Sequence, residues 1–254
     1  MKSLPKPRPG RPLLTVIVPV YNEAATLKEL MRRLAAVRIH KEVIAVDDGS
    51  TDGSGEELNA LARTGAIRLV RHGRNRGKGA AVRSALAVAR GLYSVVQDAD
   101  LETDPRDIAR LLRAALARPG TAVFGTRFPP GRSSPVSSRA PLPTRLANLI
   151  LTRAAGLLLG KRISDVTCVY KLLPTSLMRS LALRSIRFEL EAEIAAGVIR
   201  KGVPFLEIPV RYRPRGYGEG KKIHPLDGLA ILRTLVAARG YRGTRLSYNR
   251  AKGR

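Results

Sequence analysis

The sequence lacks several features that define large protein classes. Its 254 residues contain no tryptophan, few aromatic side chains and a single cysteine, Cys168. One cysteine excludes an internal disulfide framework and a cysteine-based zinc cluster. The longest apolar stretch, residues 142–160, is interrupted by Arg145 and Arg153, so no window offers the roughly 18 apolar residues that a membrane-spanning helix requires. These absences predict a protein that is soluble or peripheral to a membrane.

Acidic residues are also scarce. Asp and Glu total 20 against 46 Lys and Arg, which gives a formal net charge of +26. This charge exceeds what solubility requires and predicts an anionic partner: a nucleic acid, an anionic lipid surface or a phosphorylated substrate. We expect residues 1–12, rich in proline and free of acid, to form a disordered basic arm. Residues 241–254 are expected to form a basic tail, and residues 13–240 one catalytic domain.

Short apolar runs alternate with segments of helical periodicity along the chain. We expect strands at residues 14–18, 43–46, 67–70, 93–96, 121–125, 166–172 and 205–210. Helices are expected at residues 24–37, 52–62, 79–90, 105–117, 142–159, 189–200 and 225–238. This alternation predicts a single α/β domain with an open, mostly parallel, Rossmann-like sheet that carries helices on both faces.

Acidic side chains follow three of the expected strands. Glu23 comes after the first strand, Asp47 and Asp48 after the second, and the segment 98–102 after the fourth. In open α/β sheets, ligands bind beyond the carboxyl ends of the strands. Carboxylates gathered there repel one another unless a cation or hydrogen-bond donors compensate.

The pair Asp98 and Asp100 is the most specific of these signals. Carboxylate oxygens favour Mg²⁺ or Mn²⁺, which commonly bind substrate phosphates directly, and Glu102 offers a further ligand. The alternative is a capping cluster, because Asp104 and Pro105 begin a helix. The neighbouring acidic strand ends favour the metal interpretation.

Other segments leave two interpretations open. The glycine-rich run 73–79 is either a turn in which Gly79 permits close helix packing or a direct ligand contact. The helix 142–159 either faces the core or lies in a bilayer interface. His40, His72 and His224 are expected at the surface or in loops. Of Glu189, Glu191 and Glu193, we expect one to reach the site and the others to form a solvated face.

Several motifs together resemble a known family. Segments 18–23, 46–52, 75–79, 97–100 and 125–127 occur in the order seen in family 2 glycosyltransferases with the GT-A fold. Segment 215–221 resembles the corresponding segment of dolichol-phosphate mannosyltransferases and related polyprenyl-phosphate hexosyltransferases. Gly220 departs from that pattern, because the family often has Ser there.

The resemblance implies a role for individual positions. It implies that Pro19, Tyr21, Glu23, Val46 and Asp48 hold the nucleoside of the donor. It places Asp98 and Ala99 at the donor diphosphate, Asp100 on the metal, and Glu102 near the metal. It places Arg127, Arg215 and Lys221 on the nucleotide sugar and its phosphates. Asp98, Asp100 and Arg127 are thus the expected catalytic residues.

The implied activity is an inverting transfer of a hexose from GDP-mannose or UDP-glucose to a polyprenyl or dolichyl phosphate, with Mg²⁺ or Mn²⁺. The expected location is cytoplasmic, peripheral at the inner face of the membrane. One alternative is transfer to a saccharide hydroxyl in cell-envelope polysaccharide synthesis. A nucleic-acid-binding module is a second alternative; the acidic strand ends and the few aromatics for base stacking argue against it.

Overall fold

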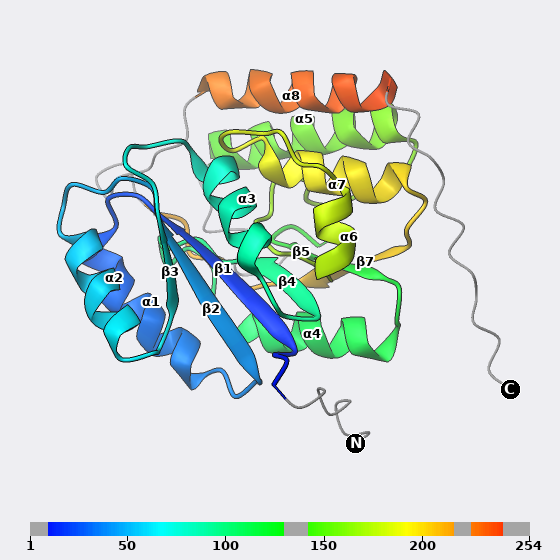
Figure 1. Ribbon diagram of the computed structural model, residues 1–254. Helices are drawn as coiled ribbons and strands as arrows, with labels where there is room; N and C mark the ends of the chain where they lie inside the picture. Colours follow the sequence, from blue (N-terminus) through cyan, green and yellow to red (C-terminus); the bar gives the residue numbers. More distant parts are fainter. Residues whose placement is uncertain (1–9, 130–141, 216–224, 241–254) are drawn as a thin grey trace, which may run out of the picture.

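The computed structural model describes residues 10–129, 142–215 and 225–240 (Figure 1). The strands are β1 (Leu14–Val20), β2 (Lys41–Asp47), β3 (Arg68–Arg71), β4 (Tyr93–Val96), β5 (Ala122–Thr126), β6 (Lys171–Pro174) and β7 (Phe205–Pro209). The helices are α1 (Ala24–Ala36), α2 (Ser54–Arg63), α3 (Lys78–Val88), α4 (Arg106–Ala117), α5 (Leu142–Leu159), α6 (Thr175–Ser180), α7 (Leu190–Arg200) and α8 (Pro225–Gly240). The expected basic arm and basic tail fall almost wholly outside the described residues.

The seven strands form one sheet in the order β3-β2-β1-β4-β6-β5-β7. Strands β1 to β4 are mutually parallel, and β5 is parallel to β7. Strand β6 is antiparallel to both of its neighbours and joins these two groups. Helix α4 lies behind the sheet in Figure 1, whereas α3 and α6 lie in front of it. The predicted open, mostly parallel sheet in a single α/β domain is confirmed.

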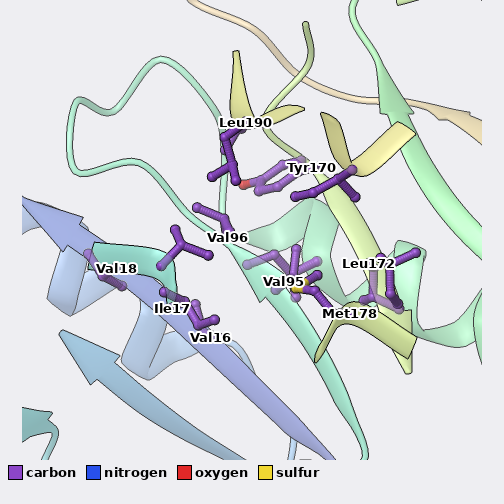
Figure 2. Close-up of a cluster of buried hydrophobic side chains, with 14 of the residues drawn as sticks. Val16, Ile17, Val18, Val95, Val96, Tyr170, Leu172, Met178 and Leu190 are labelled. Atoms are coloured by element: carbon purple, nitrogen blue, oxygen red, sulfur yellow. The ribbon is translucent and has the colours of Figure 1, made fainter. Parts of the chain in front are cut away.

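Apolar strands build a core that both halves of the chain share. Every residue of β1 except Pro19 is buried, as expected for a central parallel strand covered on both faces. Figure 2 shows Val16 to Val18 of β1 beside Val95 and Val96 of β4, with Leu172 and Leu190 from the second half packed close by. The second half is therefore part of the same domain.

The prediction of a strand at 166–172 is wrong. The strand in this region is β6, and residues 166–170 form an irregular loop whose apolar side chains are buried. Tertiary contacts fix this loop, because the Lys171 ammonium donates to the carbonyl of Cys168 at 2.6 Å and Tyr170 donates its hydroxyl to Gln97. Helix α6, a single short segment after Pro174, was not predicted. The other predicted elements lie within two residues of their observed ends.

Within the described ranges, no helix combines the length and the apolar character that crossing a bilayer requires.

Candidate active site

The carboxyl ends of β1, β2 and β4 meet at one edge of the sheet. Strand β1 lies between β2 and β4, and Val20 is in register with Asp47. The backbone N–H of Asp48 donates to the carbonyl of Val20 at 2.8 Å, and that of Gln97 donates to Ile17 at 2.8 Å. The acidic segments that follow these three strands are therefore neighbours in space, as the sequence predicts.

The segment 98–102 forms a tight acidic turn after β4. The amide of Gln97 supports it by donating to the carbonyl of Asp98 at 2.9 Å. Leu101 has a φ of 61°, a left-handed conformation that is uncommon for a residue with a side chain. The carboxylate of Asp100 accepts the N–H of Glu102 at 3.0 Å. Burial and the negative charges of Asp98 and Glu102 raise the pKa of Asp100 to about 7.

Arg215 brings the segment after β7 onto this turn. Its backbone N–H donates to the carboxylate of Glu102 at 2.9 Å, and its Nε donates to the carbonyl of Asp100 at 2.8 Å. Its Nη2 forms an ion pair with Glu23 at 2.8 Å. The structure thus places four predicted site residues from three distant segments in direct contact: Glu23, Asp100, Glu102 and Arg215.

Lys78, which is not among the site residues expected from the sequence, also contacts the acidic turn. Its ammonium is 2.7 Å from Asp98 and 2.6 Å from Glu191, the first-turn carboxylate of α7. Burial opposes the charge of Lys78, but the charges of these two carboxylates outweigh burial and raise its pKa. The sequence does offer one signal for Lys78. The run 73–79 follows β3, so Lys78 is expected at the same edge of the sheet as the acidic segments.

The glycine-rich run packs against the loop before α7. The N–H of Gly79 donates to the carbonyl of Ile186 at 2.7 Å, and a Cβ at Gly79 would lie 1.9 Å from the carbonyl oxygen of Ser185. The close-packing interpretation of Gly79 is therefore confirmed. Glu189 and Glu193 do not form a solvated face as predicted, because they accept backbone N–H groups of residues 184–187.

Asp48 is buried beneath the loop that leads to α3. Its carboxylate accepts the N–H of Arg76 at 3.0 Å and that of Gly77 at 2.8 Å. Nδ1 of His72 lies 2.5 Å from the same carboxylate, and Nε2 lies 2.9 Å from the hydroxyl of Ser84. His72 lies in the loop that follows β3, one of the two places expected for it. Its ring is buried and joins the end of β2 to α3.

These contacts give a physical basis for the prediction that Asp48→Ala weakens nucleotide binding more than Asp47→Ala. Asp48 holds three donors, whereas Asp47 accepts the N–H of Ser50. We expect Asp48→Ala to lower nucleoside diphosphate affinity at least tenfold and to cost about 2 kcal/mol of stability, since each lost buried hydrogen bond costs about 1 kcal/mol. Calorimetric titration and denaturant unfolding measure the two effects. Equal effects of the two substitutions would contradict the assignment.

Arg127 is held by a buried ion pair at the end of β5. Its Nε and Nη2 each lie 2.8 Å from an oxygen of the fully buried Asp165. Nη2 also donates to Thr167 at 2.6 Å, and the guanidinium lies 5.0 Å from the ring centroid of Tyr212. Burial opposes the charge of Arg127, but Asp165 outweighs burial and raises its pKa. Most hydrogen-bond donors of the Arg127 guanidinium are thus used in contacts within the protein.

The remaining predicted residues differ in exposure. The side chain of Tyr21 is exposed and Pro19 is half-buried, so both are accessible at the rim of the site. Val46 and Ala99 are buried. Lys221 lies outside the described residues.

The site carries an excess of negative charge in a strongly basic protein. In the part of the chain that the structure describes, two cations, Lys78 and Arg215, face five carboxyl groups. When all five are ionised, three negative charges are in excess; the five are Glu23, Asp98, Asp100, Glu102 and Glu191. Among the described residues, no three His, Cys, Asp or Glu are already arranged around a metal position. The surplus charge and the all-oxygen donor set nevertheless fit a hard divalent cation such as Mg²⁺ or Mn²⁺. Asp100 and Glu102 are the residues that would hold it.

An open α/β sheet with an acidic turn at its carboxyl edge is the arrangement expected of the GT-A class. Residues 15–181 match the family described as Glycosyl transferase family 2. The chain belongs to this family.

Curated relatives include transferases named for polyprenyl phosphates. The chain is 31% identical over 251 residues to the undecaprenyl-phosphate 4-deoxy-4-formamido-L-arabinose transferase of Edwardsiella ictaluri, covering 90% of this chain and 74% of the relative. It is 29% identical to the dodecaprenyl-phosphate galacturonate synthase of Rhizobium johnstonii, covering 82% of this chain and 61% of the relative.

Among solved structures, the glucosyl-3-phosphoglycerate synthase of Mycobacterium tuberculosis in complex with Mn²⁺ and UDP superposes with a TM-score of 0.62 at 21% identity. The match covers 91% of this chain and 81% of that chain. At this identity, the likeness shows the shared GT-A fold.

Proposed function

We propose that this protein transfers a sugar from a nucleotide sugar to a polyprenyl phosphate at a membrane surface. The observation that carries the proposal is the acidic turn 98–102, which Arg215 joins to Glu23 and Lys78 joins to Glu191. Sugar transfer leaves negative charge on the departing nucleoside diphosphate. When bound, a divalent cation neutralises that charge, and cationic side chains beside it contribute charge-assisted hydrogen bonds.

A polyprenyl phosphate fits the side chains that the site offers. Such an acceptor is already an anion at neutral pH, so its attack on the sugar needs no general base. Among the described residues, His72 is the histidine in the region of the site, and both of its ring nitrogens are engaged, by Asp48 and Ser84. The names of the curated relatives, which refer to undecaprenyl and dodecaprenyl phosphate, support the same acceptor class.

Helix α5 gives a structural reason to place the reaction at a membrane. Its buried residues are Asn148, Thr152 and Ala155, whereas Leu142 and Leu157 are 73% and 86% exposed. Asn148 accepts the hydroxyl of Thr167 at 2.7 Å. Two polar residues of α5, Asn148 and Thr152, therefore face the protein, while several of its leucines face outward, which differs from an ordinary core-facing helix.

Helix α8 lies beside α5 and extends this surface (Figure 1). We define the α5–α8 face as the exposed apolar residues Leu142, Leu146, Leu149, Ile150, Leu157, Leu229 and Val236. Arg145, Arg153 and Arg233 are exposed on the same two helices. Leucine side chains flanked by arginines suit the interface of an anionic bilayer. We infer a peripheral location at the cytoplasmic face of the membrane.

The proposed function is tested by a panel of nucleotide sugars, beginning with GDP-mannose and UDP-glucose. Each is incubated with polyprenyl phosphate and Mg²⁺ or Mn²⁺, and lipid-linked sugar is measured. We expect one donor to give a lipid-linked product. Transfer to a saccharide hydroxyl with no lipid-linked product would contradict the proposed acceptor.

We expect Leu146→Ser/Ile150→Ser to weaken binding to vesicles of phosphatidylcholine and phosphatidylglycerol by roughly a hundredfold, because each buried leucine or isoleucine contributes about 1.5 kcal/mol or more. Vesicle sedimentation measures the loss. The control is Val88→Ser/Leu92→Ser, which alters two exposed apolar residues that belong to neither α5 nor α8 and is expected to bind like wild type. Equal binding of both variants would show that the α5–α8 face does not contact the bilayer.

A further inference from the structure

Lys78 occupies a fixed position between two carboxylates. Its ammonium lies 2.7 Å and 2.9 Å from the two oxygens of Asp98 and 2.6 Å from Glu191. Both side-chain partners are engaged at distances typical of charge-assisted hydrogen bonds. Both oxygens of Asp98 are therefore in contact with the Lys78 ammonium.

The backbone on both sides of Lys78 is also fixed. Gly77 donates its N–H to the buried carboxylate of Asp48 at 2.8 Å, and Gly79 donates to the carbonyl of Ile186 at 2.7 Å. A side chain at Gly79 would collide with Ser185. The ammonium consequently cannot leave Asp98 through a movement of the loop without breaking these contacts.

This arrangement divides the acidic turn into two parts. Asp98 is paired with an internal cation that it shares with Glu191, whereas Asp100 and Glu102 retain the oxygens that suit a divalent cation. The positive charge of Lys78 reduces the attraction that the surplus carboxylates exert on a bare metal ion. The same positive charge attracts a metal that arrives with a diphosphate, because the diphosphate is more strongly negative than the metal is positive.

We propose that Lys78 is a positioning residue that holds Asp98 out of the metal position and makes the site select a metal–nucleotide complex over the bare divalent cation. The proposal rests on the proposed function for the identity of the ligand class. It predicts that metal and nucleoside diphosphate bind together, with weak binding of the metal alone.

The test uses Lys78→Met, with Lys201→Met as the matched control. Lys201 follows the last residue of α7, about 15 Å along the helix from Glu191 at a rise of about 1.5 Å per residue. Calorimetry measures binding of Mn²⁺ alone, and then of GDP and UDP in the presence of Mn²⁺. In Lys78→Met we expect Mn²⁺ alone to bind roughly three- to tenfold more tightly and the favoured nucleotide to bind roughly tenfold more weakly. Lys201→Met is expected to change neither.

Two further variants separate this role from structural support. Lys78→Met/Asp98→Asn removes the freed carboxylate, so its affinity for Mn²⁺ alone is expected to return to within about twofold of wild type. Lys78→Arg retains the positive charge, and it serves as the test variant if Lys78→Met does not fold. Because the charge is kept, we expect its affinities for Mn²⁺ alone and for the nucleotide to lie within about threefold of wild type. Circular dichroism establishes folding of each variant.

Opposite shifts of the two affinities support the proposal. A folded Lys78→Met that loses both affinities together, or changes neither, overturns it. Tight binding of bare Mn²⁺ to the wild type also overturns it, even when polyprenyl phosphate is glycosylated. Opposite shifts without any transfer to polyprenyl phosphate would instead support the role of Lys78 and contradict the proposed acceptor.

Discussion

Asp100→Asn is expected to reduce sugar transfer at least a thousandfold while making the metal-free protein more stable. Asp100 is half-buried beside Asp98 and Glu102, and its carboxylate accepts one backbone N–H, that of Glu102, at 3.0 Å. An amide oxygen at this position can still accept that bond. The substitution therefore removes a repulsive charge without removing the hydrogen bond that shapes the turn.

The expected stabilisation depends on pH in a defined direction. Burial, together with Asp98 and Glu102, raises the pKa of Asp100 in the folded protein from 3.8 to about 7. The Asp100 carboxyl thus remains protonated to a higher pH in the native state than in the unfolded chain. Its contribution to the free energy of unfolding is therefore fully present below about pH 4 and is lost as the pH rises through about 7. We expect Asp100→Asn to gain on the order of 2 kcal/mol at about pH 8 and almost nothing at about pH 4.

Denaturant unfolding in chelator and steady-state transfer assays measure the two effects. Glu29→Gln is the control, because it removes a carboxylate from the exposed side of α1, where Glu29 pairs with Arg32 and Arg33. That variant is expected to keep full activity and to change stability by less than about 1 kcal/mol. Activity of Asp100→Asn within a factor of two of wild type would remove Asp100 from the metal position.

The sequence predicts the fold well wherever the signal is local. The apolar runs of β1, β2 and β5 are short, continuous and bounded by turn residues, so their positions follow from composition alone. Residues 166–170 carry the same apolar signal, yet they form a loop because Tyr170 is drawn to Gln97 beneath the acidic turn. A run of apolar residues does not distinguish a buried loop from a buried strand.

The site residues also divide into those that local sequence signals predict and those that depend on tertiary contacts. Glu23, Asp98 and Asp100 follow predicted strands, so the ligand rule for α/β sheets finds them. Lys78 and Glu191 are separated by more than a hundred residues, and their contact depends on how the tertiary fold brings the start of α7 to the start of α3. Helical spacing indicates that the three glutamates of α7 diverge, but it does not specify which one reaches the site.

Arg127→Met is expected to destabilise the protein by about 3–5 kcal/mol, which is the typical cost of leaving one member of a buried ion pair unpaired. Asp165 has no exposed surface, and Arg127 supplies its Nε, its Nη2 and its backbone N–H to that carboxylate. Without the guanidinium, the folded state would bury an uncompensated negative charge. The large loss of stability is expected whatever part Arg127 plays in the reaction.

A double substitution separates structure from chemistry. Arg127→Met/Asp165→Asn removes both charges, while the asparagine oxygen can still accept the backbone N–H of residue 127. We expect the double variant to recover most of the stability lost in Arg127→Met, as buried ion pairs replaced as a unit commonly do. Denaturant unfolding measures this recovery, and nucleotide titration with transfer assays measures function on the same samples. If the guanidinium also contacts the donor phosphates, as the family resemblance implies, the stable double variant remains at least a hundredfold less active. Full activity in the double variant would show that Arg127 only stabilises the loop that carries Asp165 and does not act on the donor.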